Sequence, residues 1–414
     1  MRIKLQSGIP MKILLISQYF YPEQFKCNDM AAELVRRGHG VTVLTGIPNY
    51  PKGRFFDGYG LFRRRHELVS GADVHRVWLV PRGKSTPLRL ALNYFSFAVT
   101  ASCKALWLAL RHRYDAVIVH ETSPITVGIP AVLVKKLRGV PVYFWVLDLW
   151  PESLTAAGGV TNGHVLGFFT AMARWIYRNS RRILISSRGF AESIRQKGDF
   201  GGKLVYFPNW ADRALRTAAT CALPPLPEGF IAMFAGNIGE AQDFDHVMEA
   251  ARLLKDERDI HFVLVGDGRK RLWVENYVRA HRLEGTVHCL GRHPLHAMPA
   301  FFAQADVMLV SLKDELIFNL TAPAKLQAYM SAGKPIFAML NGEGARIIAE
   351  AGCGASVPAG DSAGLARIIR EAAAGDKARL TGWGQSGKAY CETHFNLDRA
   401  MDGLCRMLEN DIGH

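Results

Sequence analysis

Short apolar runs alternate with amphipathic stretches along most of the chain, and this alternation predicts its elements. In the first half, runs of strand length lie at 13–17, 41–45, 116–120, 142–147, 182–187 and 203–207, and helical patterns lie at 29–37 and 126–137. In the second half, strands are expected at 230–236, 260–266, 287–291, 307–311 and 336–340, and helices at 245–254, 270–281, 298–305, 324–331, 344–350 and 362–374. Continuous apolar strands that alternate with helices are typical of parallel sheets covered on both faces.

The two halves repeat this pattern on either side of a break. Residues 211–229 contain Pro224, Pro225 and Pro227 and carry neither a strand nor a core-helix pattern. We therefore expect an α/β protein of two doubly wound, Rossmann-like domains, 11–210 and 230–385, joined by a linker at 211–229. A helical segment, 386–414, is expected to pack back toward the first domain, and residues 1–10 to be an upstream extension. Ligands of such folds bind outside the carboxyl ends of the strands, here in a cleft between the domains.

One expected helix, 88–110, is unusually apolar. Its polar residues Arg89, Asn93, Ser96, Thr100 and Lys104 fall within about 80° of a helical wheel, and only Ser102 interrupts the apolar remainder. Such a helix either packs in a core or lies partly in a membrane interface. Trp107, followed by the basic segment 111–113, suits the interface, but core packing stays open. No run of 18 uncharged apolar residues predicts a transmembrane helix.

Charge separates the two halves of the chain. Residues 1–210 carry 29 Lys and Arg against 12 Asp and Glu, a net charge of +17, whereas residues 211–414 carry 22 against 25, a net charge of −3. A basic half indicates nucleic acid or an anionic membrane as a partner, or a solvated face with no partner. The basic segments lack aromatic interleaving or a helix-turn-helix pattern, so we expect no nucleic acid. The seven scattered cysteines contain no C-x-x-C pair, which fits a reducing cytoplasm.

Two kinds of motif in the second half suit a phosphate ligand. The expected helix 324–331 begins after Pro323 and carries Lys325 in its first turn, where free N–H groups and the helix dipole favour an anion. An ordinary loop-helix-strand unit with a solvated lysine explains the same pattern. Three glycine turns, 236–239, 266–268 and 290–292, each follow a strand and would together line one edge of a nucleotide site. The first strand lacks a following G-x-G-x-x-G, which argues against a dinucleotide dehydrogenase.

This combination resembles the retaining, GT-B-fold glycosyltransferases of family 4, from residue 11 to about residue 405. The segments that carry the resemblance are 234–239, 263–268, 290–292, 305–307 and 323–335. Three further segments, 44–53, 120–124 and 148–153, look most like the bacterial WbuB-type enzymes, which are associated with transfer of N-acetyl-L-fucosamine or a related amino sugar in surface polysaccharide assembly. The resemblance implies a nucleotide-sugar donor, which we expect to be UDP-linked, and a polyprenyl-diphosphate-linked saccharide acceptor. It also implies a cytoplasmic enzyme that is peripheral on the anionic inner face of the bacterial inner membrane.

The resemblance transfers residue roles unevenly. The Arg and Lys that the family keeps after its first C-terminal strand correspond to Asn237 and Gln242, and its Glu-x7-Glu pair to Asn319 and Gln327, or with a one-residue shift to Leu320 and Ala328. Lys325 is therefore the expected partner of the donor diphosphate. The other residues expected to bind the donor are Gly236, Asn237, Gly239, Gly266, Gly268, Arg292, Thr321 and Gln327.

The resemblance also implies catalytic and acceptor-side residues. His120 ends a strand as the family's active-site histidine does, and we expect it to be catalytic together with Asn319. Glu23 and Asp148 follow strands of the first domain and either contact the acceptor or have a capping or surface role. We see no Asp-x-Asp motif that would suggest a bound metal, and we expect neither a metal nor a cofactor. A GT-B-fold nucleotide-sugar epimerase, and less readily a basic nucleic-acid-binding protein, are the alternative functions.

Overall fold

The computed structural model describes residues 9–215 and 221–413. The chain folds into two compact units. The N-terminal unit comprises Met1–Phe207 and Ala400–His414, and the C-terminal unit comprises Pro208–Arg399. Residues 1–8 of the expected extension and residues 216–220 of the expected linker lie outside the described residues.

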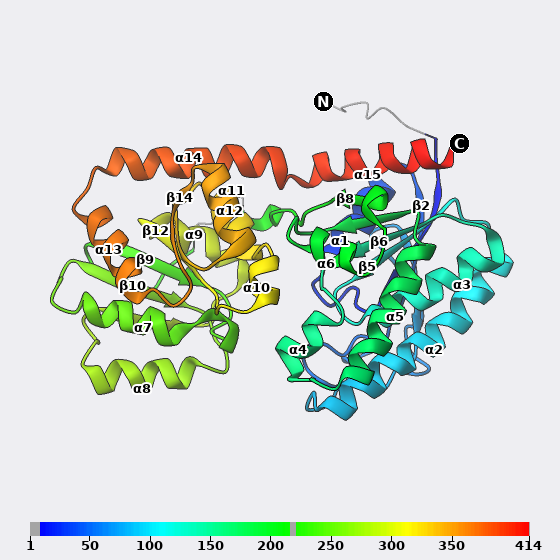
Figure 1. Cartoon of the computed structure of the whole chain (residues 1–414), viewed down its shortest axis with the longest axis horizontal. Coiled ribbons are helices and arrows are strands. Elements are labelled where there is room, and N and C mark those ends of the chain that lie inside the picture. Colours follow the sequence, from blue (N-terminus) through cyan, green and yellow to red (C-terminus); the bar gives the residue numbers. More distant parts are fainter. Residues whose placement is uncertain (1–8, 216–220, 414) are drawn as a thin grey trace. The chain divides into compact units, whose positions relative to one another are not determined.

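The N-terminal unit is built on a sheet whose described strands have the order β3-β4-β2-β1-β5-β6-β7-β8 (Figure 1). The strands are β1 (Lys12–Ser17), β2 (Gly40–Gly46), β3 (His66–Val69), β4 (Ala72–Val77), β5 (Ala116–Glu121), β6 (Val142–Val146), β7 (Arg182–Ile185) and β8 (Leu204–Tyr206). Neighbours pair in parallel, except that β3 is antiparallel to β4. Every residue of β5 and β6 is buried, as continuous apolar strands require, and the predicted parallel sheet is confirmed.

Helices cover both faces of this sheet. They are α1 (Lys26–Arg36), α2 (Pro87–Arg111), α3 (Gly128–Arg138), α4 (Glu152–Gly158), α5 (Gly163–Asn179), α6 (Phe190–Gln196) and α15 (Leu397–Ile412). The last of these helices, α15, belongs to this unit from Ala400 onward. α3 ends at Gly139, whose φ of 73° is the left-handed conformation that glycine tolerates. α15 is fastened by Asp411, which accepts hydrogen bonds from Arg182 at 2.8 and 2.9 Å.

α2 buries one side, which carries alanines together with Phe97 and Leu108, and exposes other large apolar side chains to solvent. Its alanines at 98, 101, 105 and 109 are buried on the side that packs against α3 and β2. The opposite side exposes between 42% and 71% of Leu88, Leu92, Phe95, Val99, Trp107 and Leu110. Core packing therefore accounts for one face of the helix and leaves the other face uncovered. No helix in the described part of the chain is long and apolar enough to cross a membrane.

The C-terminal unit is built on an all-parallel sheet with the described strand order β11-β10-β9-β12-β13-β14. The strands are β9 (Phe230–Ala235), β10 (Ile260–Val265), β11 (Val287–Gly291), β12 (Val307–Ser311), β13 (Ile336–Met339) and β14 (Gly354–Val357). The helices are α7 (Phe244–Leu253), α8 (Arg271–His281), α9 (Met298–Gln304), α10 (Leu316–Leu320), α11 (Ala324–Ser331), α12 (Gly342–Ala351), α13 (Ser362–Ala373) and α14 (Lys377–His394). Two apolar cores, one on each face of the sheet, confirm the doubly wound prediction.

Candidate functional site

The three glycine turns meet at the carboxyl ends of β9, β10 and β11. The N–H of Gly236 donates to the Val265 carbonyl at 2.9 Å, and the N–H of Gly266 donates to the Gly291 carbonyl at 2.8 Å. Gly236 and Gly266 have φ values of 146° and 151°, which L side chains rarely adopt. A Cβ on Gly266 would lie 1.8 Å from the Gly236 carbonyl oxygen, so only glycine allows the turns to approach. They form one edge of the sheet, as the pattern predicts.

The first two turns interlock further along the chain. The N–H of Ile238 donates to the Asp267 carbonyl at 2.9 Å, and a Cβ on Gly268 would lie 2.2 Å from the Ile238 carbonyl oxygen. A Cβ on Gly239 would lie 2.5 Å from Nδ2 of Asn237. The backbone of both turns is therefore fixed and free of intervening side chains, which suits close approach of a ligand.

Lys325 extends from the first turn of α11 to the end of β9. Its Nζ donates to Oε1 of Gln242 at 2.5 Å and lies 4.7 Å from the centre of the Phe234 ring. A Cβ on Gly236 would lie 2.7 Å from Cε of Lys325, so the glycine makes room for the lysine. Burial lowers the pKa of Lys325 to about 8, which leaves the amine mainly charged at neutral pH. No carboxylate pairs with it among the described residues, so the site can accept an anion.

The remaining donor-side residues lie around α10, α11 and β11. Gln327 is buried on α11, and the exposed Arg292 follows β11. Nδ2 of Asn319 donates to Asp314 at 2.8 Å, and the Thr321 hydroxyl donates to the Ile317 carbonyl at 2.7 Å. Within the described chain, no hydrogen bond or ion pair joins Asn319, Thr321 or Arg292 to Lys325, so their donor roles stay predictions.

Sequence patterns missed Lys313 near this edge. Lys313 follows β12, its N–H donates to the Ala241 carbonyl at 3.1 Å, and its Nζ lies 3.8 Å from Glu240. Its position two residues after a strand end was the available signal. It places a second, partly exposed amine beside the turn that holds Gln242.

His120 lies buried at the carboxyl end of β5 in the N-terminal unit. Strand pairing sets it between Ser17 of β1 and Trp145 of β6. Its Nδ1 lies 3.1 Å from the Ser17 hydroxyl, and its ring packs edge-on to Trp145 at 5.2 Å. Its Nε2 has no hydrogen-bond partner among the residues that the structure describes. Burial lowers the pKa of His120 to about 3, so the ring is neutral at physiological pH.

Two carboxyl groups lie close to His120 in the chain fold: Glu121, which is buried at the end of β5, and Asp148, which is half-buried in the loop after β6. Glu121 accepts the N–H groups of Ser123 at 3.1 Å and Asp148 at 3.4 Å. Asp148 accepts a hydrogen bond from the Ser153 hydroxyl. Burial raises the pKa of Asp148 to about 6 and that of Glu121 well above its usual value. Glu121 was not among the predicted residues, although it follows His120 directly.

Glu23 organises backbone at the same edge. Its carboxylate accepts the N–H groups of Asn49 at 2.8 Å, Tyr50 at 2.6 Å and Phe20 at 3.3 Å. These bonds tie together the loops that follow β1 and β2. Of the two roles considered, the capping role accounts for these contacts, and acceptor contact stays a prediction.

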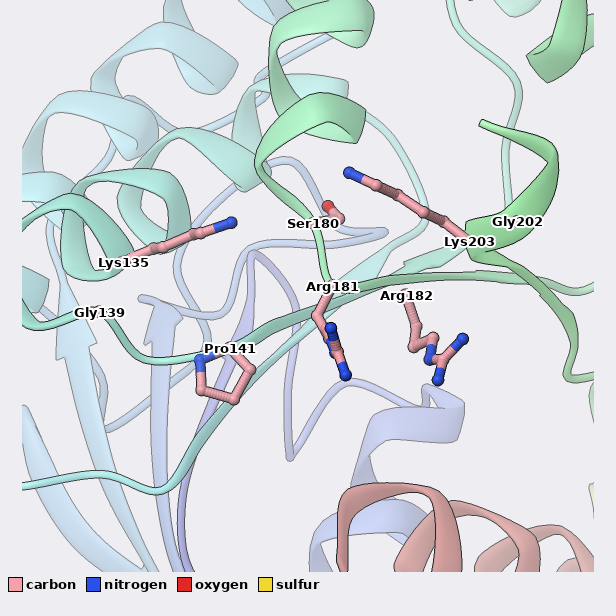
Figure 2. Close-up of a pocket in the computed structure, with 8 residues that line it drawn as sticks. All are labelled: Lys135, Gly139, Pro141, Ser180, Arg181, Arg182, Gly202 and Lys203. Carbon is pink, nitrogen blue, oxygen red and sulfur yellow. The ribbon is translucent and has the colours of Figure 1, made fainter. Parts of the chain in front are cut away.

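A basic hollow of about 430 Å³ lies at the amino ends of β6 and β7, the edge opposite to His120 (Figure 2). Its cations already have partners. Lys135 donates to the Asn179 carbonyl at 2.6 Å, Lys203 donates to the Arg178 carbonyl at 2.8 Å, and Arg181 and Arg182 pair with Asp411. The cations therefore neutralise the carbonyl end of α5 and fasten α15.

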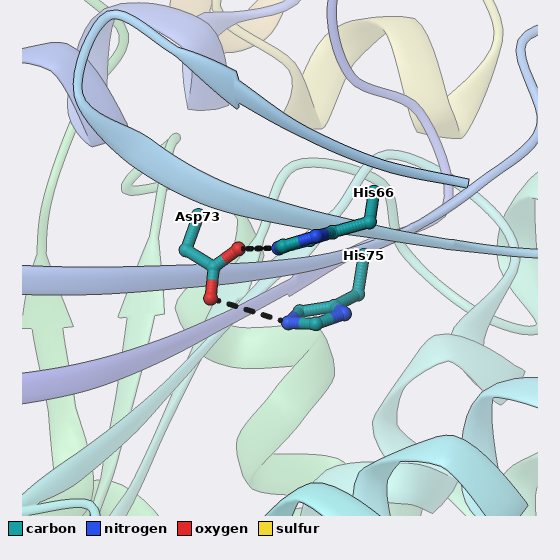
Figure 3. Close-up of side chains that lie close together, drawn as sticks. All are labelled: His66, Asp73 and His75. Carbon is teal, nitrogen blue, oxygen red and sulfur yellow. Dashed lines mark hydrogen bonds and ion pairs between the residues drawn. The ribbon is translucent and has the colours of Figure 1, made fainter. Parts of the chain in front are cut away.

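Among the described residues, three side chains of the β3–β4 hairpin, His66, Asp73 and His75, lie close enough together to hold a metal ion (Figure 3). His66 and His75 oppose each other across the two strands, and both rings hydrogen-bond to Asp73. Burial and then the nearby Lys104 lower the pKa of His75. A cation would be opposed by Lys104, and the internal hydrogen bonds already satisfy the ligand atoms.

Comparison with known proteins gives matches along most of the chain. Residues 26–210 match the family described as "Glycosyl transferase 4-like domain", and residues 229–374 match "Glycosyl transferases group 1". The chain is 29% identical over 287 residues to WbjE of Pseudomonas aeruginosa, described as a probable glycosyltransferase, covering 66% of this chain and 70% of that protein. It is 29% identical over 340 residues to WcaI of Escherichia coli, described as a "Putative colanic acid biosynthesis glycosyl transferase", covering 78% of this chain and 82% of that protein.

Solved structures share the fold of both units. Sucrose-phosphate synthase of Thermosynechococcus elongatus superposes with a TM-score of 0.73 at 14% identity, covering 97% of this chain and 99% of that chain. HepE of Anabaena in complex with UDP superposes with a TM-score of 0.68 at 14% identity, covering 97% and 100%.

Proposed function

The chain belongs to the GT-B-fold glycosyltransferases of the family 4 and group 1 type, and from this premise we propose that it is a retaining enzyme. It transfers an amino-deoxy hexose, such as the N-acetyl-L-fucosamine of the WbuB-type enzymes, from a UDP-linked donor. The acceptor is a polyprenyl-diphosphate-linked saccharide in the synthesis of a bacterial surface polysaccharide. Supporting observations are the description of the relative WcaI as a "Putative colanic acid biosynthesis glycosyl transferase" and the UDP complex of HepE.

The observation that carries the donor proposal is Lys325 beside the turn after β9. The charged amine of Lys325 lies against Gly236, and its contacts there are neutral. In the same region, Asn237 and Gln242 stand where the family has an arginine and a lysine. A diphosphate provides the missing negative charge, and its leaving requires electrostatic stabilisation. In this proposal His120 contributes a neutral ring, and the reaction needs no metal.

The enzyme would act at the inner face of the bacterial inner membrane, as a peripheral protein. Supporting this are the net charge of +17 on residues 1–210 and the large apolar side chains that α2 exposes. Basic residues attract anionic headgroups, and an amphipathic helix can bury its apolar face at the headgroup boundary.

Replacing Lys325 with alanine tests the donor site. We expect UDP-sugar affinity to fall about 10- to 100-fold, because a charged hydrogen bond to phosphate contributes about 1.5–3 kcal/mol. Titration calorimetry with UDP and UDP-sugars measures the change, and Lys388→Ala, an exposed lysine of α14, is the matched control. Equal affinities of the Lys325 variant and the parent protein would remove Lys325 from the donor site.

A panel of UDP-sugars tests the reaction itself. With a lipid-linked saccharide acceptor, mass spectrometry should detect one transferred hexose, and NMR of the product should show the anomeric configuration of the donor. Turnover of a UDP-sugar without any acceptor would instead support an epimerase.

A further inference from the structure

Arg82 is a partly buried cation enclosed by aromatic rings and without an acidic partner. Its guanidinium lies 5.1 Å from the ring centre of Tyr50 and 5.9 Å from those of Tyr19 and Tyr94. Nη1 donates to the Tyr19 hydroxyl at 3.0 Å, Nε is buried without a partner, and no carboxylate pairs with Arg82 in the described chain. By contrast, the buried Arg76 nearby pairs with Glu67 at 2.5 Å. A desolvated guanidinium normally has an anionic partner.

The loops around Arg82 hold it in place through the backbone. The N–H of Arg82 donates to Oδ1 of Asn49 at 3.2 Å, and the N–H of Gly83 donates to the Gly53 carbonyl at 2.8 Å. A Cβ on Gly53 would lie 2.1 Å from the Gly83 carbonyl oxygen, so the contact depends on that glycine. Asn49, Tyr50 and Gly53 belong to the segment 44–53 that the sequence singled out and that the donor site does not use.

Aromatic contacts connect this cation to His120 and to α2. Tyr19 stacks on Phe25 at 5.0 Å, and the Phe25 ring lies 6.3 Å from that of His120. Tyr94 belongs to α2, the helix that exposes large apolar side chains. Arg82 is therefore within the N-terminal unit, connected by these rings to its candidate catalytic histidine and to α2.

We propose that Arg82, enclosed by Tyr19, Tyr50 and Tyr94, binds the diphosphate of the lipid-linked acceptor. This assignment rests on the proposed function, since it identifies the acceptor side of that reaction. A guanidinium presents paired N–H donors to phosphate oxygens, and the surrounding rings strengthen the contact by excluding water. α2, which supplies Tyr94, also exposes large apolar side chains on its opposite side, and the isoprenoid chain can cover these.

Binding of farnesyl diphosphate, a short polyprenyl diphosphate, tests the proposal with the full chain. We expect Arg82→Gln to weaken its binding at least tenfold, whereas Arg89→Gln, which removes an exposed charge at the start of α2, changes binding less than threefold. Inorganic pyrophosphate should show the same loss at lower affinity, and farnesol should bind both variants and the parent protein equally. UDP-sugar affinity should stay unchanged in Arg82→Gln, which separates this site from the donor site at Lys325.

A second variant covers the case in which Arg82→Gln does not fold. Arg82→Lys keeps the positive charge over the rings but loses the paired donors, so we expect a five- to tenfold loss for farnesyl diphosphate with an unchanged thermal transition. Equal weakening by the Arg82 and Arg89 variants would overturn the assignment, because it would indicate a general charge effect. Parent-like affinity in either Arg82 variant would overturn it too. If the parent protein itself does not bind UDP-sugars, the result contradicts the proposed function instead.

Discussion

The neutral state of His120 affects stability as well as chemistry. The pKa of this ring falls from about 6.5 in the unfolded chain to about 3 in the folded protein, because the charged form is desolvated. The unfolded chain therefore binds more protons between these values. The contribution of His120 to stability is complete above pH 6.5 and decreases as the pH falls toward 3.

We expect this linkage to reduce the free energy of unfolding by about 2 kcal/mol between pH 7.5 and pH 5. Urea denaturation of the parent protein and of His120→Asn at both pH values measures it, since asparagine retains a polar atom near the Ser17 hydroxyl. The parent protein should lose about 2 kcal/mol more than the variant over this interval. His164→Asn, which changes an exposed histidine of α5, should behave like the parent. An equal pH dependence in His120→Asn would show that the pKa of His120 is the same in the folded protein as in the unfolded chain.

Single-residue roles were predictable where backbone geometry decides them and less so where packing does. The glycines at 236, 266 and 268 follow strand ends. The positive φ of Gly236 and Gly266 and the lack of room for a Cβ at Gly268 leave few other residue types possible. The contact of Lys325 with Gln242 spans 83 residues and depends on how α11 packs beside β9, which no local pattern encodes. Arg82 was missed for the same reason, since its enclosing rings come from three separate segments.

At the scale of elements, predictions succeeded where strands are buried on both faces. β5, β6 and β10 are continuous apolar runs and were recognisable as such. The β3–β4 hairpin was not predicted, because the exposure of β3 alternates along an edge strand and its residues are partly polar. Its turn at Ser70 and Gly71, both with positive φ, was a usable signal.

The paired turns after β9 and β10 yield a prediction for an element. In Gly266→Ala the new Cβ meets the Gly236 carbonyl oxygen, and the backbone keeps a conformation unsuited to alanine. We expect a loss of about 2–4 kcal/mol in the free energy of unfolding, together with weaker UDP binding, because the turns must separate. Gly285→Ala is the matched control, since nothing lies within 4 Å of its added Cβ. Parent-like stability and UDP affinity in Gly266→Ala would contradict the role given to this close approach.

Across the whole molecule, charge and exposed apolar surface are concentrated in the same unit. Among the described residues, the exposed large apolar side chains belong to the N-terminal unit except for Leu253, Leu272, Leu295 and Leu316. The first 210 residues also carry the entire excess of positive charge. Either property alone is common on a protein surface, but together they support the proposed association with an anionic membrane, which offers negative headgroups above an apolar layer.

This coincidence predicts which apolar substitution releases the protein from a membrane. Leu110 of α2 and Leu272 of α8 are 63% and 65% exposed, so their replacement by serine removes similar surface and should leave the thermal transition unchanged. We expect Leu110→Ser to weaken binding to vesicles of phosphatidylglycerol and phosphatidylethanolamine about tenfold, because burying a leucine side chain contributes about 1.5–3 kcal/mol. Leu272→Ser should bind like the parent. Cosedimentation with vesicles at low and high salt separates the electrostatic from the apolar contribution to binding, since salt weakens only the electrostatic contribution. If the two variants sediment equally, α2 does not enter the membrane interface and its exposed face requires another explanation.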